Sequence, residues 1–518
     1  MRFDRFAALF AAFFAFVSLA AQPAPDAASQ RNFVMLVAKH DYDLHPHRAN
    51  YSSEAQVLSG LYEGLFSYDP KTLEPMPALA AAYKVSRDKK RWTFTIREGA
   101  RFSDGEPITA RSVRDAWLRL LATPAAPYAS LLDSIVGARD FRTGLAGAES
   151  VGIAARDERT LVVTLETPMA HLPSILCHHA YAAVGEREDV YSGAFVLKSG
   201  GKDTLVLEKN PYYWDAQNVL LPSITVVATD DATENAWQFN TGHADWIVSM
   251  ADTAVLLNKN ALRIAPEFGT EYLFFSCKNA VWDNAAFRNA LIAAVPWSVL
   301  RGQSLVPATT LIYPLAGYPA VEGLTDTSPE DAADLMKQAR AAAGIPADQT
   351  LPLVFAITES ERMKKMYEIL RDAWSPLGVD VQCQKTSEAR YLHSIPSWNA
   401  DVFTYSWIGD FADPLAFLEL FREGSTLNQT AWKHPAFTRL LADAAMTTDG
   451  AERNKLLAQA EQVLLDDGVV MPLSHSVCLH VISPTAVGGW YMNALDIHPF
   501  KYLYFKAAPS TVPNVVRR

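Results

Sequence analysis

The chain contains 518 residues with a formal net charge of −11, and 49% of its residues are apolar. This length exceeds what one hydrophobic core usually holds, so two or three domains are expected. The apolar fraction excludes an intrinsically disordered protein. The negative charge excludes the broad basic surface that general nucleic-acid binding requires, so we expect no nucleic-acid partner.

The first 21 residues have the layout of a secretory signal peptide. The short basic segment MRFDR precedes the apolar run FAALFAAFFAFVSLAA, and Ser18-Leu19-Ala20 supplies small residues at the spacing of a cleavage site. A membrane anchor is the alternative, but about 16 apolar residues are short for a membrane span. No cysteine near this region could carry a lipid anchor. We therefore expect an exported, periplasmic protein.

Strand and helix patterns alternate along the rest of the chain, which favours α/β domains. In the first half we expect, in chain order, a buried strand at 32–38, a helix at 52–65, an alternating strand at 92–97, a helix capped by Thr109, a strand at 159–166 and a helix ending near Gly242. In the second half we expect a helix at 330–343 stopped by Gly344, a strand at 351–357, a helix at 360–374, a strand at 379–384, and helices at 435–446 and 451–465.

No signature of a known class of enzyme or cofactor site is present. The sequence lacks a G-x-S-x-G elbow, an H-E-x-x-H zinc motif, and the glycine loops that bind nucleotides. Two clusters of histidines, His45 with His47 and Cys177 with His178 and His179, could offer metal ligands. Adjacent residues seldom point at one ion, so packed or surface histidines are the better interpretation. We expect neither an enzyme nor a metal or cofactor site.

The four cysteines, Cys177, Cys277, Cys383 and Cys478, leave their redox state open. Export permits disulfides, and four cysteines allow three pairings. The spacing selects none of them, and unpaired buried thiols are an equal alternative.

Two carboxylates stand in the apolar stretch SWIGDFADPLAFL at 406–418. Burying a carboxylate is costly unless a cation or several hydrogen-bond donors meet it. Asp413 precedes Pro414, so we expect it to cap a helix over 415–421 with the proline in its first position. Asp410 has no comparable local role.

Several segments in order resemble one family, the extracytoplasmic solute-binding proteins of oligopeptide and dipeptide ABC transporters. They are LYEGLFSYD, PALAAAYKVSRDKKRWTFTIREGARFSDGEPITARSV, SGAFVLKSG, LVLEKNPYYWD, FNTGHADW, DNAAFRNALIAAV and PLGVDVQ. Each segment alone is a weak signal, but the ordered set spans about 33–505, nearly the whole mature chain.

The resemblance implies an α/β periplasmic-binding-protein fold of type II, in which two lobes close around a hinge. It implies a discontinuous lobe I at 31–55, 186–270 and 480–508, an extra domain at 56–185 inserted into it, and lobe II at 271–479. We expect the protein to be a monomer that delivers its ligand to a membrane-embedded ABC permease with cytoplasmic ATPases.

The family match also implies a binding mode, in which an extended peptide lies in the cleft and an aspartate meets its α-ammonium group. By position in the Trp-x-x-Asp segment, that aspartate is Asp410. The full set of ligand-binding residues implied is Asp410, Trp407, Ser406, Ile408, Tyr128, Asn50, Ser52 and Glu388.

The chain departs from the family where tripeptide binders hold the carboxylate end of the ligand. The corresponding positions are the uncharged Ile395, Met363 and Thr404, with Arg362 as the nearest base. A disulfide of some relatives is also missing, because its positions are Gly269 and Ile408. Peptide length therefore stays open, and the alternative is a protein of the same fold that binds a metal chelate, haem, an opine or a sugar.

Overall fold

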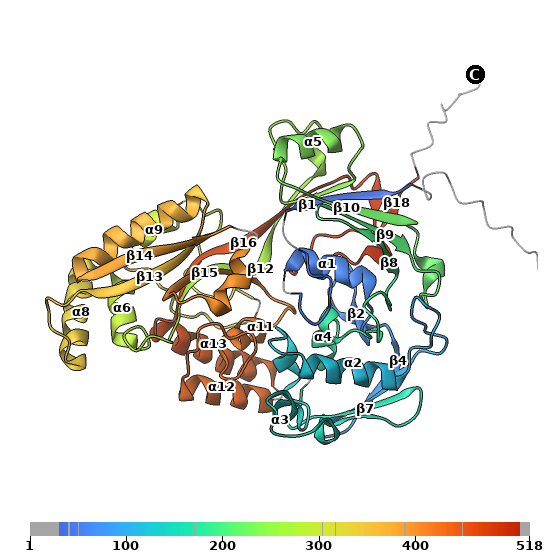
Figure 1. Ribbon diagram of the computed structural model, residues 1–518, viewed down its shortest axis with the longest axis horizontal. Coiled ribbons are helices and arrows are strands. Elements are labelled where there is room, and N and C mark those ends of the chain that lie inside the picture. The colour runs from blue at the N-terminus through green and yellow to red at the C-terminus, as the bar shows by residue number, and fades with distance from the viewer. Residues whose placement is uncertain are drawn as a thin grey trace, which may run out of the picture.

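The computed structural model describes residues 31–39, 42–49, 51–169, 171–302, 304–315, 317–387, 390–447 and 449–507. The signal peptide expected at 1–21 and the expected ligand contacts Asn50 and Glu388 lie outside these residues. Strands and helices alternate as the sequence indicates, and two lobes lie side by side, joined by long strands (Figure 1). The expected α/β class is confirmed.

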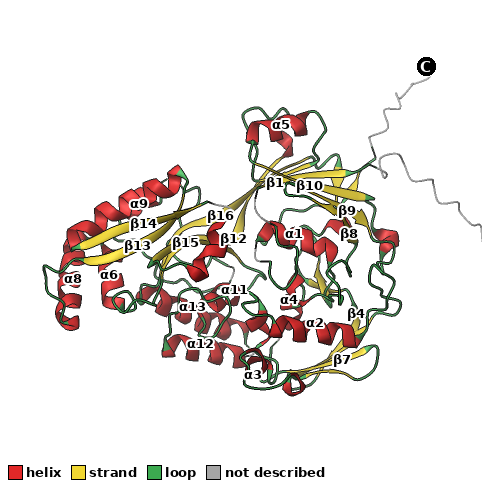
Figure 2. Ribbon diagram, viewed as in Figure 1, coloured by secondary structure: helices red, strands yellow, loops and turns green. Residues whose placement is uncertain are grey.

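One ten-stranded sheet runs through both lobes of the described chain (Figure 2). Its strand order is β14-β13-β15-β12-β16-β11-β1-β10-β9-β8. In chain order the strands are β1 (Phe33–Ala38), β8 (Phe195–Gly200), β9 (Thr204–Lys209), β10 (Ser223–Thr229), β11 (Trp246–Val248), β12 (Leu262–Phe275), β13 (Leu351–Thr358), β14 (Val379–Thr386), β15 (Val402–Ile408) and β16 (Val470–Ile482). Strands β1 and β8 to β11 belong to lobe I, and β13 to β15 belong to lobe II.

The two longest strands, β12 and β16, connect the lobes. They pair antiparallel, and their register shifts between Pro266 and Thr270 and again between Glu271 and Tyr272. Such irregularities bend a strand and increase its local twist. The irregular pairing therefore lies in the two strands that join the lobes. The lobe boundaries expected at 270/271 and 479/480 fall inside these two strands, and the domain division stays a prediction.

A separate four-stranded sheet with order β4-β5-β7-β6 lies within 56–185, the segment predicted to be the inserted domain. Its strands are β4 (Ala80–Val85), β5 (Arg91–Ile96), β6 (Ile153–Ala155) and β7 (Thr160–Thr164). Trp92, Phe94 and Ile96 are buried on one face of β5, which is the expected alternation. Helix α2 (Ala110–Ala122) begins where expected, because the Thr109 hydroxyl accepts the N–H of Ser112. Two-stranded pairs complete the strands: β2 (Phe66–Tyr68) with β3 (Pro75–Pro77), and β17 (Val487–Gly488) with β18 (Tyr504–Phe505).

The remaining helices cover the sheets, and their packing builds the cores. They are α1 (Ser52–Leu61), α3 (Ala138–Arg142), α4 (Leu172–Ile175), α5 (Ala232–Asn240), α6 (Ala285–Ala293), α7 (Trp297–Leu300), α8 (Pro329–Ala343), α9 (Glu361–Trp374), α10 (Tyr391–Ser394), α11 (Leu415–Leu418), α12 (Pro435–Met446) and α13 (Gly450–Asp466). The expected stop of α8 is confirmed, since Gly344 is left-handed with φ 68°. None of the helices in the described ranges is long and apolar enough to cross a membrane.

All four cysteines are unpaired. Cys277 and Cys478 are buried, and Cys177 and Cys383 are partly buried. Of the two alternatives left by the sequence, the structure therefore has unpaired thiols.

Candidate functional site

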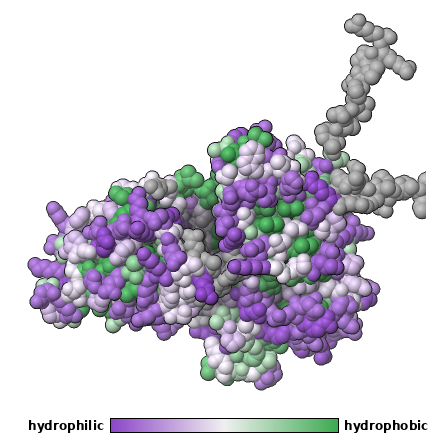
Figure 3. Space-filling view, turned by 45° about the horizontal axis from the view of Figure 1, so that its top comes forward, coloured by the Kyte–Doolittle hydropathy of each residue, from purple (hydrophilic) through white to green (hydrophobic). Residues whose placement is uncertain are grey.

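Two adjoining cavities lie between the lobes. The first, which we call the Asp410 cavity, has a volume of about 290 Å³, and the second, the Glu267 cavity, has a volume of about 600 Å³. Both are lined by Ser52, Ser406, Ile408 and Asp496. Figure 3 shows the surface hollowed where the two lobes meet. The shared lining makes the two cavities one continuous cleft.

Strand β15 forms the lobe II wall of this cleft, and half of its length has an unpaired edge. Along its inner edge β15 pairs with β12 from Val402 to Ile408. Its other neighbour, β13, pairs with it only at Val402 and Phe403. Within the described chain, no strand occupies the outer edge of β15 at 404–408. An extended ligand can add to such an edge through main-chain hydrogen bonds.

The end of β15 is fixed by close packing. The Trp407 indole N–H donates to the carbonyl oxygen of Ala416 at 3.0 Å, which anchors the side chain under the strand. A Cβ on Gly409 would come within 2.5 Å of the Phe268 ring, so only glycine allows the backbone to approach this closely. This turn carries the chain from the strand into the cavity at Asp410. Trp407, Gly409 and Asp410 all line the Asp410 cavity.

The Asp410 carboxylate is buried without a positively charged partner among the described residues. Its side chain is 13% exposed, and the nearest basic atom is His178 Nε2 at 3.5 Å from Oδ1. Burial lowers the pKa of His178 well below its ordinary value, so this imidazole is neutral at pH 7 and the contact is no ion pair. Burial also raises the pKa of Asp410 to about 8. A cation entering the cavity would reverse that shift.

Residues from the segment predicted to be the inserted domain also line the Asp410 cavity. The Tyr68 hydroxyl donates to the backbone carbonyl oxygen of Asp410 at 2.6 Å. Tyr128 is buried, and the centre of its ring lies 4.2 Å from that of His178 and 6.4 Å from that of Trp407. The Tyr181 hydroxyl donates to the Tyr128 carbonyl oxygen at 2.8 Å. Three parts of the chain that are distant in sequence thus meet around one carboxylate.

The second carboxylate of this stretch, Asp413, has its cation within the chain. Its oxygens accept from Arg453 Nη1 at 2.6 Å and Nη2 at 3.0 Å. Burial opposes ionisation here too, but the Arg453 guanidinium lowers the pKa of Asp413. The expected cap is present, since Asp413 Oδ1 accepts the N–H of Leu415. The helix begins one residue later than expected, however, with Pro414 at its N-cap and not in its first turn.

The lobe I wall comes from two places in the sequence. Ser52 is the first residue of α1, and Asp496 follows β17 in the C-terminal segment. Asp496 has a left-handed backbone with φ 53°, a conformation that aspartate tolerates better than most residues. Its carboxylate is bound by two imidazoles, His480 Nε2 at 2.7 Å and His498 Nε2 at 3.0 Å.

The residues implied for the carboxylate end of a ligand are placed as follows. Ile395 and Met363 are buried and Thr404 is half-buried, and none of the three lines a cavity. Arg362 lines the Glu267 cavity, but its guanidinium is held by both oxygens of Glu271, at 2.7 and 2.5 Å. Lys365 lines the same cavity and is exposed. Gly269 and Ile408, the positions of the missing disulfide, face each other in the β12–β15 register.

Of the eight residues implied by the resemblance, six lie together in the cleft. Ser52, Tyr128, Ser406, Trp407, Ile408 and Asp410 all line the Asp410 cavity. Their roles toward a ligand stay predictions. The sequence interpretation missed four residues that also line the cleft, namely His178, Tyr68, Asp496 and Glu267. His178 was visible in the CHH run but was interpreted as packing, and the others carry no local signal.

Hydrogen bonds also join the inserted domain to lobe II beside the cleft. The Thr426 hydroxyl donates to the Pro127 carbonyl oxygen at 2.6 Å, and the Thr426 N–H donates to Ser130 Oγ at 3.0 Å. Arg142 donates to the Gly424 carbonyl oxygen at 2.9 Å. These contacts join two segments that are about 300 residues apart in the sequence.

The chain matches the sequence profile described as bacterial extracellular solute-binding proteins, family 5 Middle, over residues 74–429. It is 28% identical over 491 residues to the periplasmic oligopeptide-binding protein OppA of Salmonella typhimurium, which covers 89% of this chain and 90% of that protein. It is also 28% identical over 499 residues to the probable deoxycholate-binding periplasmic protein YgiS of Escherichia coli, covering 90% of this chain and 91% of that protein.

A solved structure of a relative agrees with these matches. The structure of the Escherichia coli murein tripeptide binding protein MppA is similar with a TM-score of 0.81 and 25% identity, covering 92% of this chain and 99% of that one. The unliganded open form of MppA gives a TM-score of only 0.63, with 26% identity and coverage of 92% and 97%. This chain is therefore more similar to the first of these structures than to the unliganded open form.

Proposed function

Because the chain belongs to the family 5 bacterial extracellular solute-binding proteins, we propose that it binds oligopeptides in the cleft between its lobes. In this proposal Asp410 holds the α-ammonium group of the peptide, and the peptide backbone pairs with the outer edge of β15 at 406–408. Ser52 faces the peptide from lobe I and Tyr128 from the inserted domain. Asn50 and Glu388 stay expected contacts outside the described residues.

The observation that carries this proposal is the position of Asp410 next to an unpaired strand edge. A buried carboxylate without a cation is unfavourable, and in the empty protein it is relieved by a proton. A peptide supplies both missing partners at once, an ammonium group for the carboxylate and a backbone for the strand edge. Inside a cleft closed against water, the ion pair is stronger than it would be at the surface.

The mechanism that follows is binding with closure and no chemical change to the ligand. Ligand contacts with both lobes favour the closed arrangement, with β12 and β16 bending between them. The closed monomer would then deliver its peptide from the periplasm to a membrane-embedded ABC permease driven by cytoplasmic ATPases. Curated relatives such as the OppA of Salmonella typhimurium are described as periplasmic, which supports this location.

A non-peptide ligand is the second candidate, and the relative YgiS, described as a probable deoxycholate-binding protein, favours it. Deoxycholate is an anion at neutral pH. The cleft of this chain instead presents the carboxyl groups of Asp410, Asp496 and Glu267, and its Arg362 is paired with Glu271. The charge of the cleft therefore favours a cationic group over an anionic one.

Native mass spectrometry of the protein purified from the periplasm without denaturation tests the proposal. We expect a set of co-purified ligands whose masses form a ladder of peptides. A single non-peptide mass would contradict the proposal and support the second candidate. Incubating the protein with a peptide mixture should leave the peptides intact, and their hydrolysis would contradict the role as a binding protein.

A further inference from the structure

We propose that Glu267 and Asp496 form a second cation-binding subsite, which selects peptides with a basic side chain among their first residues. The inference rests on the proposed function and adds a substrate class to it. In this arrangement the α-ammonium group meets Asp410 on lobe II. The side-chain cation of the same peptide meets the two carboxyl groups on the side of lobe I.

Glu267 is a buried acid with no partner among the described residues. It lies on β12 within the irregular stretch between Pro266 and Thr270, where the register with β16 shifts, and it lines the cavity named after it. It is 7% exposed, yet no hydrogen bond or ion pair joins it to any described residue. Its carboxyl group therefore faces the cavity, where an incoming cation can meet it.

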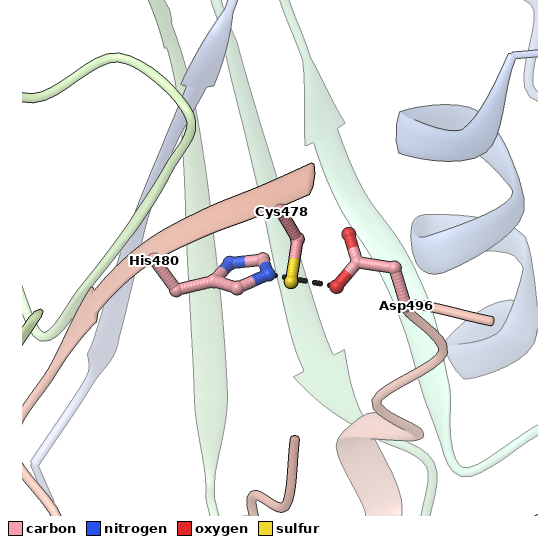
Figure 4. A group of neighbouring side chains, drawn as sticks. All are labelled: Cys478, His480 and Asp496. Atoms are coloured by element: carbon pink, nitrogen blue, oxygen red, sulfur yellow. Dashed lines mark hydrogen bonds and ion pairs between the residues drawn. The ribbon is translucent and has the colours of Figure 1, made fainter. Parts of the chain in front are cut away.

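Asp496 supplies the second carboxylate, and its immediate neighbours are neutral. The Trp246 indole N–H donates to His480 Nδ1 at 3.1 Å. Because an indole can only donate, His480 Nδ1 carries no proton, and the proton of the neutral ring is on Nε2. That Nε2–H donates to Asp496 Oδ1, the contact drawn in Figure 4. His498 also contacts Oδ1, so Oδ2 is left without a partner among the described residues.

The same hydrogen bonds argue against a metal ion at this place. Cys478, His480 and Asp496 lie close enough together to hold one (Figure 4). However, a metal on His480 Nε2 would need the lone pair that the proton occupies, while Nδ1 accepts from Trp246. The Cys478 thiol donates to the Ala265 carbonyl oxygen at 3.4 Å, and burial raises its pKa to about 12. The trio is therefore explained by hydrogen bonding.

Three acids, Glu267, Glu271 and Asp496, and two bases, Arg362 and Lys365, line the Glu267 cavity. Burial and the neighbouring Asp496 raise the pKa of Glu267 to about 8, so the empty site holds a proton that an incoming cation can replace. Burial opposes ionisation of Asp496, but its two imidazole donors keep its pKa low. The other charged or titratable groups lining the cavity are Glu271 and Arg362, which pair with each other, the exposed Lys365, and His475, whose pKa burial lowers to about 4.

The position of Asp496 sets which residues of the ligand can reach the subsite. It lines both cavities, whereas Asp410 lines only the first and Glu267 only the second. A peptide whose amino terminus is at Asp410 can therefore place a nearby lysine, ornithine or arginine side chain along Ser52 and Ser406 to Asp496 and Glu267. Charge-assisted hydrogen bonds to both acids would then stabilise it.

Calorimetric titration of peptides into ligand-free protein at pH 7.5 tests the subsite. The peptides are trialanine and its three variants with lysine at the first, second or third position. We expect at least one lysine peptide to bind about tenfold tighter than trialanine, since the gain is that of a hydrogen bond to a charged group. Glu267→Gln should remove this preference while trialanine still binds, and Asp496→Asn should weaken it.

Glu461→Gln is the matched control, because Glu461 is also a buried glutamate with a raised pKa, about 7, but does not line the cleft. This variant should keep the lysine preference. Equal affinities for all four peptides, or a preference that survives Glu267→Gln, would overturn the proposal. So would one zinc ion that binds the protein and is lost with Cys478→Ser, because the site would then be a metal site.

Titration with a diamine shows whether the subsite exists even if the proposed peptide-binding function is wrong. If no peptide binds, the peptide-binding function is contradicted, and 1,4-diaminobutane is titrated instead. Diamine binding that Glu267→Gln abolishes supports the subsite independently of peptides. Absence of diamine binding in that case overturns the subsite as well.

Discussion

Asp410 and Asp413 lie three residues apart in one apolar segment, yet they are held in opposite ways. Asp413 receives both guanidinium nitrogens of Arg453 and the N–H of Leu415, and its pKa is lowered. Asp410 faces a neutral imidazole, and its pKa is raised. One carboxylate is paired within the chain, and for the other we propose a ligand as the partner.

The same contrast recurs at other acids of the described chain. Asp133 has Arg142 at 2.6 Å, and Glu63, which lines the Asp410 cavity, has Lys501 at 2.8 Å. Asp410 and Glu267 have no such cation among the described residues. Leaving a buried acid without a cation is unfavourable for folding.

The largest effect is expected from removing the cation of Asp413. Arg453→Ala leaves a buried carboxylate unpaired and should lower the free energy of unfolding by roughly 3 kcal/mol. Urea unfolding followed by circular dichroism measures this change. Peptide affinity of the folded variant should stay as in the parent protein, because neither Asp413 nor Arg453 lines the cleft. An unchanged free energy of unfolding would contradict the claim that Arg453 stabilises the buried carboxylate of Asp413.

The next effect is the pH dependence of stability of the ligand-free protein. Asp410 keeps its proton in the folded chain up to about pH 8, whereas the unfolded chain loses it near pH 4. Asp410 therefore lowers stability as the pH rises from about 4 to 8, by at most about 1.4 kcal/mol per pH unit. Asp410→Asn should reduce this slope by the contribution of one proton in thermal unfolding measured over that range, while the raised pKa values of Glu267 and Glu461 keep the rest of it.

Asp413 should show the opposite sign. Its lowered pKa contributes stability above about pH 4 that is lost as the pH falls through the folded value. Asp413→Asn should therefore flatten the acid side of the profile and leave the slope between pH 4 and 8 in place. Profiles of the same shape for the two variants would contradict the contrast between the carboxylates.

The smallest effect is expected at the contact between the inserted domain and lobe II. Thr426→Val removes the hydroxyl that donates to Pro127 and accepts from Ser130. The closed form should lose about 1 kcal/mol, which weakens peptide binding several-fold because binding requires closure. Calorimetry measures the affinity, and unfolding of the ligand-free variant should be unchanged. Unchanged peptide affinity would show that this contact contributes nothing to closure.

Much of the fold could be predicted from the sequence, because its signals are local. Apolar periodicity, the Thr109 cap and the Gly344 stop each depend on a few neighbouring residues, and the ordered motifs indicated the family. The separate roles of Asp410 and Asp413 were also predicted in part, because a proline follows only one of them. Asp413 was predicted correctly as a cap, since its Oδ1 accepts the N–H of Leu415, but Pro414 stands at the N-cap and not in the first turn.

The surroundings of the site could not be predicted in the same way. Tyr68 and His178 reach Asp410 from the inserted domain, and no spacing in the sequence shows that this domain folds under lobe II. Glu267 has nothing local to distinguish it from an exposed glutamate, because its burial depends on the irregular pairing of β12 with β16. The positions of these residues depend on contacts between segments that are distant in the sequence.

The central claim is that the ligand supplies the cation of Asp410. Calorimetry of one peptide with a free and with an acetylated amino terminus, on the parent protein and on Asp410→Asn, tests it most directly. We predict that acetylation weakens binding to the parent protein about tenfold or more and has little effect on the variant, since the charged pair is already gone. An equal loss in both proteins would show that Asp410 does not meet the α-ammonium group.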